Sequence, residues 1–266
     1  MNLFVTSLSL MLIGIAMFYP ILFMPIDRQV KKENVSRRFL QFNYLIHIIA
    51  GFISILLYWI YSVNYPLQLS GVVYVVVIIV VVLFYWNTEL TKWNLFTASI
   101  IFGLIVFYRS INEIVEITPL WPGIFTGLLS AGALSILLHL LISSVSRASE
   151  RNPENSLNKY LLKYLFFFIG IRIAWDVVIL FNLSVETQYG DVISALKFFW
   201  QSDSIKLSIL IILGMIVPSV YFIVFRNKLT GASSKNRTLL LMILFVSIVT
   251  AELLYKYFLL QFGIVL

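Results

Sequence analysis

The sequence predicts an all-α, polytopic membrane protein with eight transmembrane helices. Of its 266 residues, 61% are hydrophobic and only 12% are charged, whereas soluble chains average about 45–50% apolar and about 25% charged residues. The mean hydropathy of the chain is +0.97. Because a spanning helix needs about 20 predominantly apolar residues, and the chain contains several such stretches, we expect the apolar excess to face lipid.

The predicted helices follow the apolar stretches in chain order. They cover residues 3–24, 40–61, 70–86, 93–108, 121–142, 161–181, 207–225 and 239–262. The first contains Pro20 and Pro25, which we expect to bend its inner end because proline lacks an N–H donor. The third is rich in valine and isoleucine, but a lone strand cannot satisfy its backbone polar groups in lipid. A helix is therefore predicted there as well.

The distribution of lysine and arginine predicts the orientation. These residues gather in the connections after the first, fifth and seventh helices: Arg28, Lys31, Lys32, Arg37, Arg38, Arg147, Arg151, Lys159, Arg226, Lys228, Lys235 and Arg237. Basic residues favour cytoplasmic loops, so these connections are expected inside and both termini outside the cell. Aromatic residues near the predicted outer ends, such as Tyr58, Trp121 and Tyr255, are typical of an interfacial belt.

The connections also suggest how the chain is organised. We divide it into the first five helices (1–142), a polar cytoplasmic linker (143–158) and the remaining three helices (159–266), all within a single integral membrane domain. Short up-down connections favour antiparallel neighbours, so two four-helix bundles side by side are expected.

Composition limits the chemistry. The chain has no cysteine and only two histidines, His47 and His139, so it cannot form disulfides, a cysteine-held iron–sulfur cluster or a three-histidine metal centre. We expect no metal site, no catalytic side chain and no tightly bound cofactor in this chain. The two histidines lie at similar predicted depth, however, and one alternative is that they ligate a haem b.

Two pairs of opposite charges occur within the predicted spans. Arg172 and Asp176 lie four residues apart in the sixth helix, and Glu252 and Lys256 have the same spacing in the eighth, so each pair shares one helix face. Each pair can cancel its own charge and hold helices together, but ionisable residues at membrane depth also mark functional sites. A further alternative is therefore a small transporter or permease that uses these four residues as its substrate path. Paired glycine or proline breaks in matching helices would favour it, and the sequence shows none.

Three short motifs resemble one known family. Between the fourth and fifth helices stand Arg109, Asn112, Ile114, Thr118, Pro119 and Trp121. This run resembles the Arg-x-x-Asn-x-Ile segment, followed by a Thr-Pro or Trp-rich helix start, of the membrane-anchor subunit (DmsC) family of dimethyl sulfoxide reductase, which is related to the NrfD and polysulfide-reductase anchors. Ala251-Glu-Leu-Leu-Tyr-Lys-Tyr-Phe resembles that family's Gly-Glu-Leu-x-x-Arg-x-x-Phe, and Gly51-Phe-Ile-Ser resembles its Gly-Phe-Ile-Ala.

The resemblance implies a multi-pass subunit of the cytoplasmic (inner) membrane of a prokaryote that serves anaerobic respiration. It would tether a molybdopterin catalytic subunit and a four-cluster iron–sulfur subunit, and would exchange electrons with menaquinol; nucleic acid is not an expected partner. Whether the subunit itself oxidises quinol or only anchors its partners stays open.

The resemblance also implies where the quinone binds. It would lie near the outer ends of the first four helices, bordered by Tyr58, Arg109, Asn112, Glu113 and Glu116. A histidine of the family at the outer end of the second helix corresponds here to Tyr58. A phenol is a poorer proton acceptor than an imidazole at neutral pH.

Overall fold

The computed structural model describes residues 3–23, 25–26, 37–61, 65–87, 94–113, 120–146, 156–186, 191–225 and 234–262. Within these ranges, eight helical segments are long and apolar enough to cross a membrane. The described residues are otherwise helical or in short turns, apart from one two-stranded hairpin. The predicted fold class, an all-α polytopic membrane protein, is therefore confirmed.

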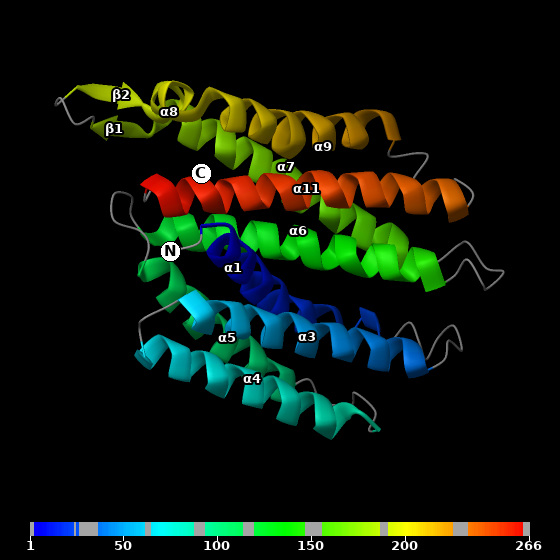
Figure 1. Ribbon diagram of the computed structural model, residues 1–266. Helices are drawn as coiled ribbons and strands as arrows, with labels where there is room; N and C mark the ends of the chain where they lie inside the picture. The colour runs from blue at the N-terminus through cyan, green and yellow to red at the C-terminus, as the bar shows by residue number, and fades with distance from the viewer. Residues whose placement is uncertain are drawn as a thin grey trace.

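The helices run back and forth between two ends of an elongated stack (Figure 1). Their bounds are α1 Leu3–Phe18, η1 Tyr19–Leu22, α3 Arg37–Tyr61, α4 Tyr65–Tyr85, α5 Asn94–Asn112, α6 Leu120–Ser146, α7 Ser156–Asn182, α8 Ala195–Leu210, η3 Ile211–Ile216, α9 Val217–Val220, η4 Tyr221–Phe225 and α11 Ser234–Phe262. Both chain ends lie at the same end of the stack in Figure 1, which we call the terminal end. Pro20 lies in the first turn of the 3₁₀ helix η1, where the α-helix of the first span ends; the bend at Pro20 and Pro25 stays a prediction.

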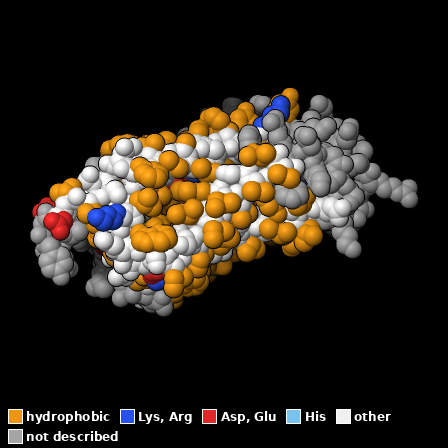
Figure 2. Space-filling model, turned by 90° about the horizontal axis from the view of Figure 1, so that it is seen from above, with side chains coloured by type: hydrophobic (Ala, Val, Ile, Leu, Met, Phe, Trp, Pro, Cys, Tyr) orange, Lys and Arg blue, Asp and Glu red, His pale blue; other side chains and the backbone are white. Residues whose placement is uncertain are grey.

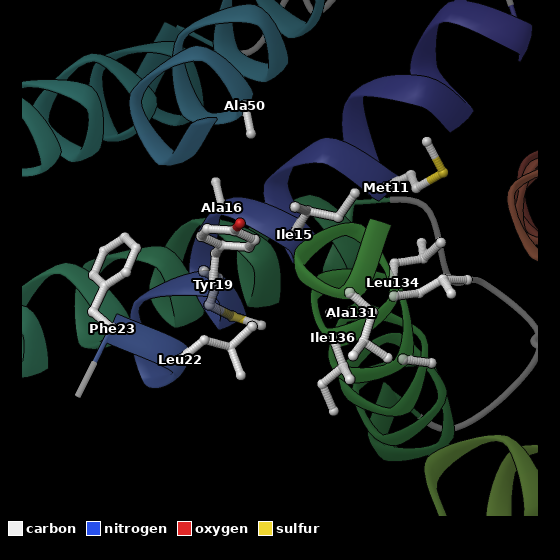
Figure 3. Close-up of a cluster of buried hydrophobic side chains, with 14 of the residues drawn as sticks. Met11, Ile15, Ala16, Tyr19, Leu22, Phe23, Ala50, Ala131, Leu134 and Ile136 are labelled. Carbon is white, nitrogen blue, oxygen red and sulfur yellow. The ribbon is translucent and has the colours of Figure 1, made fainter. Parts of the chain in front are cut away.

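Helices α1 and α6 occupy the interior of the stack. In their apolar spans, 72% and 78% of the residues are buried, against 44% or less in each other span. Helix α1 packs against α3, α5, α6 and α11. Figure 3 shows Ala16 of α1 facing Ala50 of α3, with Ala131 and Leu134 of α6 on the other side of α1. The small residues allow this close approach, since a Cβ at Gly14 would lie 3.2 Å from the Cβ of Ala131.

The outer helices expose their apolar side chains. Helix α3 alone exposes Phe42, Ile49, Phe52, Leu56, Trp59 and Ile60, and hydrophobic side chains cover the middle of the face in Figure 2. A soluble monomer rarely exposes so large an apolar surface. This arrangement is the one expected of helices that face lipid.

The seventh span differs from its prediction. It was expected at residues 207–225, preceded by a loop from Asn182, but the antiparallel hairpin of β1 (Ser184–Glu186) and β2 (Val192–Ser194) occupies part of that loop. Helix α8 then begins at Ala195, where Ser194 caps it by accepting a hydrogen bond from the Lys197 N–H. The cap and the hairpin start the helix twelve residues earlier than apolarity alone indicates.

An interruption inside α8 explains part of that difference. Asp203 has non-helical angles (φ −157°, ψ 76°), and its Oδ1 accepts a hydrogen bond from the backbone N–H of Lys206 at 3.1 Å. This geometry is that of an N-cap residue. A short helix therefore precedes Asp203, and the apolar part of the span begins just after it.

Two further boundaries bear on the predicted linker. Helix α6 continues to Ser146 and α7 begins at Ser156, so helix enters the segment 143–158 from both sides. Residues 147–155 lie outside the described residues.

Candidate functional site

Two of the residues predicted to border a quinone meet in the structure. The hydroxyl of Tyr58, near the end of α3, donates a hydrogen bond to Oε2 of Glu113, which directly follows α5. Tyr58 is 7% exposed, because its helix turns it away from the lipid-facing Trp59. The structure thus joins a phenol and a carboxylate from different helices at the terminal end.

Of the other three residues predicted to border the quinone, two lie in the last turn of α5, next to this pair. Arg109 and Asn112 are exposed in the last turn of α5, and the Arg109 carbonyl accepts the backbone N–H of Glu113 at 3.1 Å. This bond continues the helical turn, so Arg109 and Glu113 are neighbours along one side of α5. Glu116 lies outside the described residues.

The charged pair of α7 is almost completely buried. Nε of Arg172 lies 3.3 Å from Oδ1 of Asp176, and the two side chains are 8% and 0% exposed. The guanidinium also lies over the ring of Tyr255 in α11, with its Cζ 4.2 Å from the ring centroid. Within a low-dielectric interior, such a pair is stable only when its charges are compensated nearby.

The charged pair of α11 supplies part of that compensation. Oε2 of Glu252 accepts a hydrogen bond from the Lys256 ammonium at 3.4 Å, and Oε1 lies 3.9 Å from Nε of Arg172. The hydroxyl of Tyr255 donates to Asp176. The two pairs predicted from sequence are therefore one connected group, which we call the ion cluster: Arg172, Asp176, Glu252, Lys256 and Tyr255.

Two members of this region were not predicted to have a role. Tyr255 was assigned to the interfacial belt, and this was wrong, because the side chain is 3% exposed and points into the stack. Ser130 of α6 donates a hydrogen bond of 2.5 Å to Oε1 of Glu252. Neither contact follows from spacing along one helix. A polar residue one turn from a buried charge, as Tyr255 is three residues from Glu252, is the signal that could have identified it.

The seventh span lies against the ion cluster where its helix is irregular. The π-helical segment η3 is followed by Pro218, which has no N–H to bond the carbonyl of Gly214 in the usual α-helical register. Gly214 and Pro218 line a cavity of about 20 Å³ together with Arg172, Glu252 and Ser130. A Cβ on Gly214 would lie 3.0 Å from the Tyr255 hydroxyl oxygen. π-Helical turns occur frequently at functional sites.

The two histidines lie toward the end of the stack opposite to the termini, and each lies beside a different polar side chain. Nε2 of His47 lies 3.2 Å from the hydroxyl oxygen of Ser99. Nδ1 of His139 lies 3.1 Å from Oδ1 of Asn43, which also accepts a hydrogen bond from Tyr19 at 2.7 Å. Among the described residues, no group of three or more histidine, aspartate or glutamate side chains could hold a metal ion.

The His139 tautomer follows from this arrangement. The amide nitrogen of Asn43 donates to the carbonyl of Phe39 at 2.7 Å, which fixes Oδ1 as the acceptor. Nδ1 of His139 must then carry the proton, and Nε2 carries the lone pair. The haem alternative stays a prediction.

No protein-family profile matches the chain, and neither a curated protein nor a solved structure matches it. The fold and the buried charges define a multi-pass, all-α membrane protein with ionised groups inside its helical stack.

Proposed function

We propose that the protein is the membrane-anchor subunit of a dimethyl-sulfoxide-reductase-like molybdoenzyme and exchanges electrons with menaquinol. The hydrogen bond between Tyr58 and Glu113 is the observation that carries the proposal. It joins two of the residues that the resemblance implicates, from positions 55 residues apart in the sequence. The partners are a molybdopterin catalytic subunit and an iron–sulfur subunit with four clusters, and the setting is anaerobic respiration.

The Glu113 carboxylate supplies the proton acceptor that a neutral tyrosine at position 58 lacks. Quinol oxidation requires a proton acceptor beside each hydroxyl, and an ionised carboxylate accepts hydrogen bonds and protons where a neutral phenol donates. Glu113 would accept one of the two quinol protons and the other would pass to water at the terminal end, while Tyr58 would orient the headgroup and hold the carboxylate in place. The electrons would pass to the iron–sulfur partner, because the anchor supplies binding and proton acceptors rather than redox groups.

The orientation belongs to the same proposal. Basic residues flank the end of the stack opposite to the termini, where Arg37 begins α3, so that end would face the cytoplasm of a prokaryote and the Tyr58–Glu113 pair the outside. We also propose that α1, α3, α4 and α5 form one four-helix bundle and the remaining spans a second, with α1 and α6 at their interface.

The test compares quinol-linked with dye-linked turnover in the assembled complex. Glu113→Gln should lower quinol-linked turnover at least tenfold, since a general base contributes roughly 10²–10⁴ in rate, and Tyr58→Phe and Arg109→Ala should also lower it. Dye-linked turnover of the partner subunits should not change. Tyr108→Phe is the matched control, because Tyr108 is a lipid-facing tyrosine, 48% exposed, near the same end of α5. Wild-type quinol turnover in Glu113→Gln would remove this pair from the site.

Transport is a second candidate, favoured by the irregular seventh span beside the ion cluster. Transporters bind substrates where interrupted helices meet charged groups at membrane depth. The cavity at Gly214 and Pro218 measures about 20 Å³, which suits about one water molecule. Any larger substrate would need α9 to move away from α11. Uptake of a labelled substrate by proteoliposomes, lost in Glu252→Gln, would favour transport over quinol oxidation.

A further inference from the structure

The first three turns of α7 carry an exposed cation between two exposed tyrosines. Lys163 is exposed, and its ammonium lies 5.7 Å from the centroid of the Tyr160 ring. Tyr160 and Tyr164 are 60% and 57% exposed. Among the residues that the structure describes, no aspartate or glutamate forms an ion pair with Lys163. Its positive charge can therefore bind an anion from outside the stack.

The depth of Lys163 makes this charge costly without a partner. The apolar span of α7 begins at Tyr160, so Lys163 lies three residues, or about 4.5 Å, inside it. A lysine near the end of a spanning helix extends its long side chain to bring the ammonium to the level of the lipid headgroups. Negative charge at that level is supplied by anionic phospholipids.

The sequence around Lys163 adds to the positive charge on this side of α7. Position 159, one turn earlier in the same helix, is also a lysine. Positions i and i+4 share a helix face, and like charges at this spacing destabilise a helix. Two lysine positions on one face therefore favour an anionic headgroup over a zwitterionic one.

The surface below Lys163 is open and apolar. Gly170 lies seven residues further along α7, which corresponds to about 10 Å of rise and about 20° around the helix axis. A Cβ on this exposed glycine would meet nothing within 4 Å, so no packing contact in the described part of the chain requires a glycine there, although glycine weakens a helix. Phe167 and Phe181, on the same side of α7, are 60% and 64% exposed. An acyl chain fits this lipid-facing surface.

We infer that Lys163 and Tyr160 bind the phosphate of an anionic phospholipid at the end of the stack opposite to the termini, and that one acyl chain of this lipid lies over Gly170. The ammonium donates charge-assisted hydrogen bonds to the phosphate oxygens, and the Tyr160 hydroxyl donates to the same group. The site is continuous with the lipid-facing side of α7, which favours a lipid over a soluble anion. This inference does not depend on quinol chemistry at Tyr58.

Native mass spectrometry of the full chain tests this inference, with the protein released from micelles that contain equal amounts of phosphatidylglycerol and phosphatidylcholine. The wild-type protein should retain phosphatidylglycerol in preference to phosphatidylcholine. Lys163→Gln should lower the retained phosphatidylglycerol about fivefold, which is the factor that one lysine contributes near an anionic surface, and Lys163→Arg should retain the lipid. Lys197→Gln is the matched control, because Lys197 is an exposed lysine at the terminal end, and it should bind as the wild type does.

Two further measurements test the acyl chain and the source of the phosphate. Gly170→Leu, which fills the open position below Lys163, should lower the retention of phosphatidylglycerol. Glycerol phosphate in excess should not displace the lipid, because it has no acyl chain to pack against α7.

Four results would each overturn the inference. They are equal retention of the two phospholipids by the wild-type protein, equal losses in Lys163→Gln and Lys197→Gln, unchanged retention in Gly170→Leu, and displacement of the lipid by glycerol phosphate.

Discussion

The Arg172–Asp176 pair should show a much larger coupling energy than the closer pair Asp203–Lys206, because a buried pair is screened less by water. The Nζ of Lys206 lies 2.6 Å from Asp203, but the side chains are 39% and 23% exposed. Arg172 and Asp176 are 3.3 Å apart and 8% and 0% exposed. Exposed pairs contribute roughly 0.2–1 kcal/mol, whereas Coulomb's law at 3.3 Å and an effective dielectric constant of about 20 gives about 5 kcal/mol.

Two double-mutant cycles measure the difference. Arg172→Met alone should cost about 3–5 kcal/mol, because it leaves Asp176 buried without its cation. Combining it with Asp176→Asn should recover at least about 2 kcal/mol, a coupling energy within the range for interacting neighbours. The cycle of Asp203→Asn with Lys206→Met should give a coupling energy of about 1 kcal/mol or less.

The assay is reversible unfolding of the purified protein in mixed micelles, with helicity and tryptophan fluorescence as independent probes. Additive effects at Arg172 and Asp176, or a coupling at Asp203 and Lys206 that equals the buried one, would refute the assignment of the ion cluster as a mutually compensating group.

Two other predictions concern packing and cofactors. Gly127→Ala should destabilise the protein by about 1–3 kcal/mol, because its Cβ would lie 2.2 Å from Cζ of Phe107, while Gly170→Ala, with nothing within 4 Å of its Cβ, should be neutral or slightly stabilising; unfolding of both variants in micelles checks this. An absorption spectrum of the purified protein should show no Soret band, and a band abolished by His47→Gln would instead establish the haem alternative.

Much of the fold could be predicted because lipid imposes one strong rule. Spans of about 20 apolar residues must be helical to satisfy their backbones, and this located all eight described spans. The start of the seventh span was misplaced because it depends on two caps, Ser194 and Asp203. Such caps are single polar residues in a mixed segment, and hydropathy does not detect them. The irregular turn before Pro218 is likewise a matter of one missing N–H.

The candidate site was predictable only where spacing along one helix is informative. The i,i+4 rule paired Arg172 with Asp176 and Glu252 with Lys256, and both pairs are observed. It could not show that Arg172 also approaches Glu252, since that contact depends on how α7 packs against α11. The meeting of Tyr58 with Glu113 was indicated by resemblance rather than by any periodicity.

Cysteine accessibility tests the central claim of the proposed function, that the end bearing the termini faces outward and carries the Tyr58–Glu113 pair. The chain has no cysteine, so single substitutions can be placed at exposed positions near each end: Asn112 and Glu186 at the terminal end, Val145 and Asn236 at the other. With a membrane-impermeant maleimide on intact cells, Asn112→Cys and Glu186→Cys should react at once, and Val145→Cys and Asn236→Cys only after permeabilisation. The opposite pattern would place the Tyr58–Glu113 pair in the cytoplasm and contradict the account.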